Sequence, residues 1–216
     1  MAPLVNKLPK SDNVLFVLYD FETTQDTMIS DSATLHVPNL ECLQFCSRCE
    51  MQANIHTDCE RSGRRRHSFW EDPVGDLLSH LCENRRWCDR VIAIAHNARG
   101  FDAQFIFDRA IMLKWTPELI LNGQKIICMK IQHVIFLDSI SFMPMALRKL
   151  PEAFGLSASK SWYSHLFKSR ANLNYVGSIP DMAEYGVGEM DESEREEFKS
   201  WYDAQKHKVF DNRRVL

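Results

Sequence analysis

The apolar run from Leu15 to Tyr19 constrains this chain most, because two carboxylates one residue apart follow it directly. Such a run predicts a buried strand, and side chains alternate between the two faces of a strand. Asp20 and Glu22 are therefore expected on one face, with Thr23 and Thr24 where the strand opens into a loop. Neighbouring carboxylates repel, and a hard divalent cation such as Mg²⁺ or Mn²⁺ commonly compensates their charge. A solvated strand end is the alternative interpretation, so a second cluster is needed.

A second polar cluster follows the apolar run Val91–Ala95. After His96-Asn97 and a glycine, the segment Phe101–Met112 has the apolar spacing of a helix. Asp102 is then expected in the first helical turn, where free N–H groups favour a carboxylate and a metal beside the first strand is within reach. A plain N-cap aspartate is the alternative interpretation.

The two clusters resemble the first and second exonuclease motifs of the DEDD nucleases. Their sequences most resemble those of the family B DNA polymerases that start from a protein primer, as in phages, adenoviruses and Polinton transposons. Three later segments continue the resemblance in order over nearly the whole chain: Phe136–Met145, Leu150–Leu156 and Lys160–Tyr163. The resemblance implies an α/β, ribonuclease H-like fold with a mixed sheet flanked by helices, forming a single 3′-to-5′ exonuclease domain over residues 1–216.

The resemblance also implies roles for individual residues. Two ions of Mg²⁺ or Mn²⁺ would be held by Asp20, Glu22 and Asp102. The 3′ end of single-stranded DNA would be held by Thr23, Asn97, Phe101 and Ser139. Lys160 would assist catalysis, although Ser161 follows it where the family usually has glycine. Two cations about 4 Å apart supply the nucleophile and stabilise the leaving oxygen in phosphodiester hydrolysis. A surface lysine is the alternative interpretation of Lys160.

The third motif of that family, a tyrosine with a carboxylate four residues later on a helix, does not occur downstream of Asp102. Tyr185 and Glu189 have the spacing, but Gly186 and Gly188 between them favour a loop. Asp203 and Asp211 are late acids that could substitute for it, but a solvated helix face is the better interpretation. We therefore expect these 216 residues, with three of the four carboxylates and no polymerase palm, to degrade DNA poorly or not at all.

Four of the seven cysteines fall in one stretch, which predicts a zinc-binding loop at residues 42–67. Cys46 and Cys49 have the C-x-x-C spacing that grips one tetrahedral Zn²⁺, and Cys59 supplies a third thiolate. His67, His56 or Cys42 would complete the ligands, of which His67 is our assignment. Cysteines without a metal are the alternative. Cys82, Cys88 and Cys128 are expected in the core.

Composition narrows the function only modestly. With 45% hydrophobic residues, the chain can bury a real core, and its formal charge of −3 gives no general attraction to DNA. Binding of single-stranded DNA would depend on local features such as Lys160 and the arginines from Arg61 to Arg66. A signal peptide and membrane spans are absent, so we expect a soluble intracellular protein, with nucleus or cytoplasm left open. A terminal (primer) protein is a possible partner.

The remaining pattern predicts the order of elements. Strands are expected at residues 14–20, 35–37, near 43, 91–95, 126–131 and 134–137, and helices at 74–84, from 101, at 145–154 and from the Asp191/Ser193 cap to Phe210. Asn122-Gly123 indicates a hairpin. Three functions compete: an exonuclease portion of a polymerase, a non-catalytic DNA-binding module from a domesticated polymerase, and a stand-alone exoribonuclease. The third is disfavoured because Asp138-Ser139 and Lys160 resemble the polymerase branch.

Overall fold

The computed structural model describes residues 13–30, 33–46, 57–156, 162, 164, 166–167, 170–172 and 174–212, with only the backbone for 22–30, 33–41 and 170. The chain divides into two compact units. The first is Met1–Glu22 with Pro38–Met145, and the second is Thr23–Val37 with Ala146–Leu216. The prediction of one domain with a zinc loop at 42–67 stays a prediction.

A mixed seven-stranded sheet in the order β3-β2-β1-β4-β7-β6-β5 is the framework of the fold. Its strands are β1 (Val14–Ser30), β2 (Ala33–Cys46), β3 (Arg66–Phe69), β4 (Arg90–Ala95), β5 (Glu118–Asn122), β6 (Lys125–Ile131) and β7 (Val134–Asp138). The central strands β1, β4 and β7 run parallel, with Phe16 beside Ile92 and Ile92 beside Ile135. Because they are parallel, their carboxyl ends meet at the same edge of the sheet.

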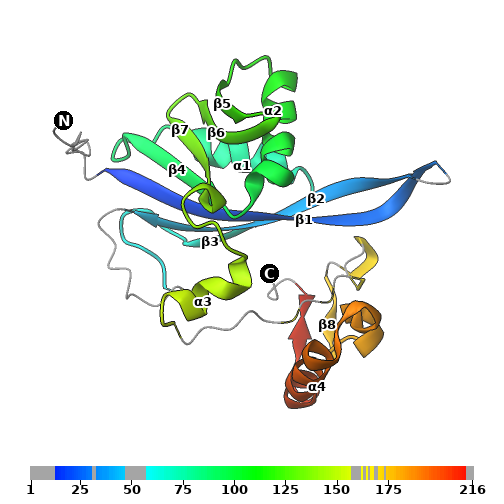
Figure 1. Ribbon diagram of the computed structural model, residues 1–216. Coiled ribbons are helices and arrows are strands. Elements are labelled where there is room, and N and C mark those ends of the chain that lie inside the picture. Colours follow the sequence, from blue (N-terminus) through cyan, green and yellow to red (C-terminus); the bar gives the residue numbers. More distant parts are fainter. Residues whose placement is uncertain are drawn as a thin grey trace, which may run out of the picture. The chain divides into compact units, whose positions relative to one another are not determined.

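Helices and short 3₁₀ turns connect the strands (Figure 1). The α-helices are α1 (Pro73–Cys82), α2 (Asp102–Met112), α3 (Leu150–Ala153) and α4 (Glu192–Gln205). The 3₁₀ turns are η1 (Ala98–Gly100), η2 (Ser139–Ser141), η3 (Leu147–Lys149), η4 (Arg170–Asn172), η5 (Met182–Tyr185) and η6 (Val187–Glu189). A small second sheet pairs β8 (Val176–Gly177) with β9 (Phe210–Asp211). No helix among the described residues is long and apolar enough to cross a membrane.

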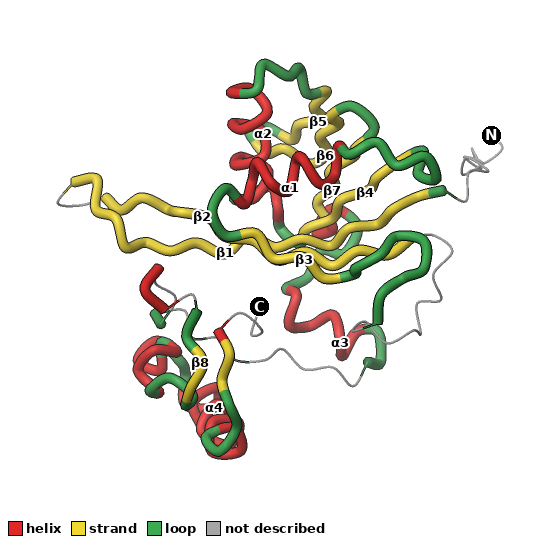
Figure 2. Tube along the Cα trace, turned by 180° about the vertical axis from the view of Figure 1, so that it is seen from behind, coloured by secondary structure: helices red, strands yellow, loops and turns green. Residues whose placement is uncertain are grey.

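The core of the first unit lies between one face of the sheet and the neighbouring helices α1 and α2 (Figures 1 and 2). Alternation along β1 decides which side chains enter it: Leu15 and Val17 are fully buried, whereas Leu18 is 45% exposed. Leu77 and Ile106 bring the two helices into the same cluster. Burial of each such side chain contributes roughly 1.5–3 kcal/mol, so this face positions both the strands and the helices.

Most of the predicted elements are confirmed. The strands after residues 14, 91, 126 and 134, the helix near 74–84 and the helix after Phe101 are all present. The Asn-Gly hairpin joins β5 to β6, and Gly123 at its tip has φ +60°, which glycine adopts without a steric penalty. The mixed α/β sheet with helices is thus confirmed.

The first hairpin differs from the prediction. β1 does not open into a loop at Thr23 but continues to Ser30, and β2 is one strand where two short ones were predicted. β1 and β2 are hydrogen-bonded neighbours in the sheet, and the β-branched Thr23 and Thr24 favour an extended backbone. The predicted 42–67 loop likewise begins within β2 and ends in β3.

The last helix is shorter than predicted. Asp191 caps α4 by accepting a hydrogen bond from the Glu194 N–H at 2.8 Å, as predicted, but the helix ends at Gln205 instead of Phe210. Phe210 is buried, and its backbone pairs with Gly177 in the second sheet. Its ring packs against the ring of Tyr175. Tertiary burial of one aromatic ring therefore overrides the helical pattern.

Aromatic side chains form the centre of the second unit. Phe198 of α4 is fully buried, and its ring centroid lies 5.1 Å from Tyr185 and 5.3 Å from Trp162. Tyr202 packs on the same ring and donates its hydroxyl hydrogen bond to Pro180 O at 3.0 Å. The Tyr185 ring is thus a core element of this unit.

Candidate active site

The structure brings the two acidic clusters of the sequence into direct contact. The main-chain N–H of Phe21, between Asp20 and Glu22 in β1, donates a hydrogen bond to Asp102 Oδ1 at 3.1 Å. Asp102 is buried in the first turn of α2, as the sequence predicts. The Asp20 side chain is exposed. The backbones of Glu22 and Thr23 lie in β1, and their side chains lie outside the described atoms.

The pKa of Tyr19 indicates that this edge of the sheet is negatively charged. Its pKa is raised well above the ordinary value, first by burial and then by the negative charges of Asp102, Asp138 and Asp20. The phenol is therefore neutral at physiological pH. The three carboxylates make this edge of the sheet negatively charged, although they do not form a group that could hold a metal ion among the described residues.

Asp138 is a site residue to which sequence reasoning assigned no role. At the carboxyl end of β7, this buried carboxylate accepts hydrogen bonds from the N–H groups of Asn97, Arg99 and Ile140 at 2.9, 3.2 and 3.1 Å. The Arg99 guanidinium lies 3.5 Å away. Asp138 thereby fixes the β4–α2 loop that carries Asn97. Its place at the end of an apolar strand was the signal available in the sequence.

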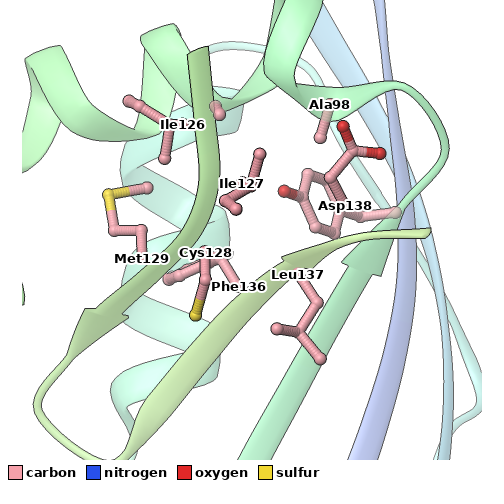
Figure 3. Close-up of a pocket in the computed structure, with 10 residues that line it drawn as sticks. Ala98, Ile126, Ile127, Cys128, Met129, Phe136, Leu137 and Asp138 are labelled. Carbon is pink, nitrogen blue, oxygen red and sulfur yellow. The ribbon is translucent and has the colours of Figure 1, made fainter. Parts of the chain in front are cut away.

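A small apolar pocket lies beside this carboxylate (Figure 3). Ile126 and Met129 of β6 line it together with Phe136 of β7, and Asp138 lies at the end nearest Ala98. Tyr19 also lines the pocket. These apolar walls exclude water, which is the physical cause of the Tyr19 pKa shift.

Ser139, predicted to bind DNA, is buried and hydrogen bonded to His96. The Ser139 hydroxyl lies 2.9 Å from His96 Nδ1, and His96 Nε2 lies 2.9 Å from Met145 O. Since a carbonyl only accepts, Nε2 donates the hydrogen bond to Met145 O. Ser139 therefore positions His96 in this structure, and its predicted DNA contact stays untested.

Asn97 and Phe101, also predicted to bind DNA, are both exposed at the loop before α2. Asn97 has φ +65°, a left-handed conformation that asparagine tolerates better than most residues. Phe101 is 39% exposed and packs edge-on against Phe105, with 4.9 Å between ring centroids. One part of the Phe101 ring is thus anchored while another faces solvent beside Asp102.

The remaining predicted acids belong to the second unit. Tyr185 ends η5 and Glu189 ends η6, with Gly186 between them at φ +69°, so no single helix carries both. This confirms the loop predicted from the glycines. Asp203 lies exposed on α4, where it pairs with Lys206 at 2.9 Å. Lys160 lies outside the described residues.

The predicted zinc ligands are only partly brought together. Cys46 Sγ and Cys59 Sγ lie 3.6 Å apart, whereas Cys49 and His56 lie outside the described residues. His67 stands opposite Cys42 in the β2–β3 pairing, four positions along the strand from Cys46. The Nε2 atom of His67 lies 2.9 Å from Arg64 O. Within the described part of the chain, no three His, Cys, Asp or Glu side chains form a metal-binding group.

The chain is similar to known DNA polymerases. Residues 85–214 match the family described as DNA polymerase type B, organellar and viral. A protein from Agaricus bitorquis named "Probable DNA polymerase" is 29% identical over 133 residues, which are 58% of this chain and 17% of that protein. The chain thus corresponds to less than a fifth of this relative. No solved structure matches significantly.

Proposed function

The chain belongs to the organellar and viral type B DNA polymerases, and we propose that it forms the 3′-to-5′ exonuclease portion of such an enzyme. One observation carries the proposal: the hydrogen bond from the Phe21 N–H to Asp102 joins two acidic segments 81 residues apart, just past the stretch in which β1 pairs with β4. A purely structural N-cap would satisfy the N–H groups of its own helix, whereas Asp102 follows the N-cap residue Phe101 and its carboxylate accepts a hydrogen bond from β1.

The donor set fits a divalent cation. Asp20, Glu22 and Asp102 would hold Mg²⁺ or Mn²⁺, which when bound supplies an activated water and neutralises charge on the scissile phosphate. Around them the chain provides rigidity: Asp138 fixes the loop from Asn97 to Arg99, and His96 ties β4 to Ser139. Neutral Tyr19 adds no negative charge to the cluster.

A single-stranded 3′ end is the proposed substrate. The exposed part of the Phe101 ring can stack on a terminal base, and the Asn97 amide can contact sugar or phosphate, neither of which reads sequence. Thr23, Ser139 and Lys160 belong to the same proposal through the family resemblance. A terminal protein as partner rests on that resemblance alone.

A ribonuclease H-like fold is part of this proposal. Its support is the row of parallel strands β1, β4 and β7, flanked on one side by the antiparallel pair β2–β3 and on the other by β6 and β5. Asp20 and Glu22 follow the stretch of β1 that pairs with β4, and Asp102 follows β4 in the next helix. Open parallel sheets place their ligands beyond the carboxyl ends of such strands.

We also propose that a structural Zn²⁺ is bound by Cys46, Cys49 and Cys59. The 3.6 Å distance between Cys46 Sγ and Cys59 Sγ supports it. Purified protein should contain about one Zn²⁺ per chain, and Cys49→Ser should release it and lower stability, because metal binding energy contributes to folding. Protein prepared without chelator that contains no zinc would contradict this part.

A non-catalytic DNA-binding module is the second candidate. It is favoured by the separation of Tyr185 and Glu189 into two 3₁₀ turns, since no helix within the described residues after Asp102 supplies the third motif. Such a module would keep the Phe101 surface and bind single strands without turnover.

A digestion assay tests the proposal. A single strand labelled at its 5′ end is incubated with the chain in Mg²⁺ and then in Mn²⁺, with Asp20→Ala/Glu22→Ala as the control. We expect slow, metal-dependent shortening from the 3′ end that the control lacks. Binding of the strand without shortening would select the non-catalytic module. Neither binding nor shortening, or shortening that persists in the control, would overturn the exonuclease proposal.

A further inference from the structure

A single arginine lies in the loop that carries two of the proposed DNA ligands. Arg99 belongs to η1, between Asn97 and Phe101, and residues 91–108 contain no other lysine or arginine. Nearby carboxylates make this edge of the sheet negatively charged, and the whole chain has a formal charge of −3. A polyanion such as DNA is therefore repelled here unless a local positive charge compensates.

Asp138 holds both the main chain and the side chain of Arg99. Its buried carboxylate accepts a hydrogen bond from the Arg99 N–H at 3.2 Å and lies 3.5 Å from the Arg99 Nε. Ala98, which is 3% exposed, anchors the same turn in the core, and its carbonyl accepts from the Phe101 N–H at 3.1 Å. Because the turn is fixed in this way, the Arg99 side chain loses less entropy when it binds a ligand.

The contact with Asp138 does not use the paired N–H groups of the guanidinium. An arginine that neutralises a carboxylate in the most favourable geometry donates two parallel hydrogen bonds of about 2.7–2.9 Å. At 3.5 Å, the Nε of Arg99 forms only an ion pair, and 27% of the side chain is exposed. Neither Nη atom of Arg99 donates a hydrogen bond to any residue that the structure describes. These donors therefore remain available for a ligand.

We propose that Arg99 binds a phosphate of the single strand near its 3′ end, and that Asp138 is the residue that positions the guanidinium. The inference rests on the proposed function and adds a residue to the same site. The guanidinium matches two phosphate oxygens with two N–H groups. A phosphate contact orients the strand without reading its sequence, which is also true of base stacking on Phe101.

Binding of a fluorescent single strand to the parent chain, Arg99→Gln and Arg99→Lys tests the proposal. A chelator in the buffer prevents digestion, and anisotropy is measured over a series of KCl concentrations. Arg86→Gln is the matched control, because this exposed arginine precedes β4 whereas Arg99 follows it. Urea denaturation shows whether each variant is folded.

Arg99→Gln should bind roughly tenfold more weakly, the lower end for a hydrogen bond to a charged group. The slope of log K against log salt should fall in magnitude by about 0.7, the value for one phosphate contact on a single strand. Arg99→Lys keeps the charge without the paired donors, so it should keep the slope and lose less affinity. Arg86→Gln should match the parent.

A parent that binds the strand while Arg99→Gln binds equally well, or no worse than Arg86→Gln, would overturn the role of Arg99. The exonuclease proposal would then still stand. A parent that binds no single strand would overturn both proposals.

Strands with one neutral methylphosphonate provide a measurement that a folding defect does not imitate. The substitution is placed at the first, second or third linkage from the 3′ end. At one of these linkages the parent should lose roughly tenfold in affinity, whereas Arg99→Gln should lose little, because its contact is already absent. If Arg99→Gln does not fold, Arg99→Lys takes its place in this comparison. Equal losses in parent and variant, or no loss in the parent at any of the three linkages, would overturn the proposal.

Discussion

The main-chain N–H of Phe21 and the carboxylate of Asp102, 81 residues apart in sequence, are joined by a hydrogen bond of 3.1 Å. This contact fixes the start of α2 against the middle of β1. Any cation held by Asp20 and Asp102 would therefore lie between two elements that the core already positions.

Two substitutions of Asp102 distinguish its contribution to stability from its contribution to metal binding. Asp102→Ala should lower the free energy of unfolding by about 1–3 kcal/mol, because the buried Phe21 N–H loses its acceptor. Asp102→Asn keeps Oδ1 as an acceptor and should retain most of that stability but lose Mn²⁺ affinity. Urea denaturation and calorimetric Mn²⁺ titration measure the two effects. Undiminished Mn²⁺ binding by Asp102→Asn would show that the carboxylate is only structural.

Phe101→Ala should weaken binding of a single-stranded 3′ end by roughly 1–3 kcal/mol, the usual range for loss of a stacking ring. The effect on duplex DNA should be smaller, because paired bases are not available for stacking. Fluorescence anisotropy measures both, with Ile111→Ala at the other, exposed end of α2 as the control. Equal losses on both DNAs, or none, would mean that Phe101 serves only to pack against Phe105.

Asp138→Ala should destabilise the first unit by about 3–5 kcal/mol, because it leaves the Arg99 charge and three N–H groups without their common acceptor. Glu118→Ala removes the exposed ion pair between Glu118 of β5 and Lys130 of β6. It should lower the free energy of unfolding by less than about 1 kcal/mol. Urea denaturation of the two variants measures the difference. Similar losses would mean that solvent reaches the Asp138 carboxylate.

Stability should fall in mild acid because of His80. Burial, then the nearby His67 and Arg85, lowers the pKa of His80 to about 4 from its usual 6.5. The unfolded chain therefore binds a proton that the folded chain does not, so this stability is complete above pH 6.5 and is lost as the pH falls toward 4.

The partial exposure of the His80 ring screens this effect to about 1–2 kcal/mol. His80 Nε2 lies 2.9 Å from Gln44 Oε1, so His80→Gln removes the titration but keeps an amide donor in that region. Unfolding at pH 7 and pH 4.5 should differ less in this variant than in the parent. An identical pH dependence would assign the acid sensitivity to other groups.

Local sequence pattern was sufficient for much of the framework. The apolar run Leu15–Tyr19 predicts β1, the apolar run at Val91–Ala95 predicts β4, and the spacing after Phe101 places Asp102 in the first turn of α2. These features depend on the period of a strand or helix, which neighbouring residues determine.

Only the tertiary structure decided how distant segments meet. The length of β1 beyond Thr23 depends on pairing with β2, and the end of α4 depends on burial of Phe210. Asp138 acquires its role from N–H groups about forty residues earlier, and His67 is separated from Cys46 by the register of β3. Such contacts join residues far apart in sequence, and no local period encodes their register or their partners.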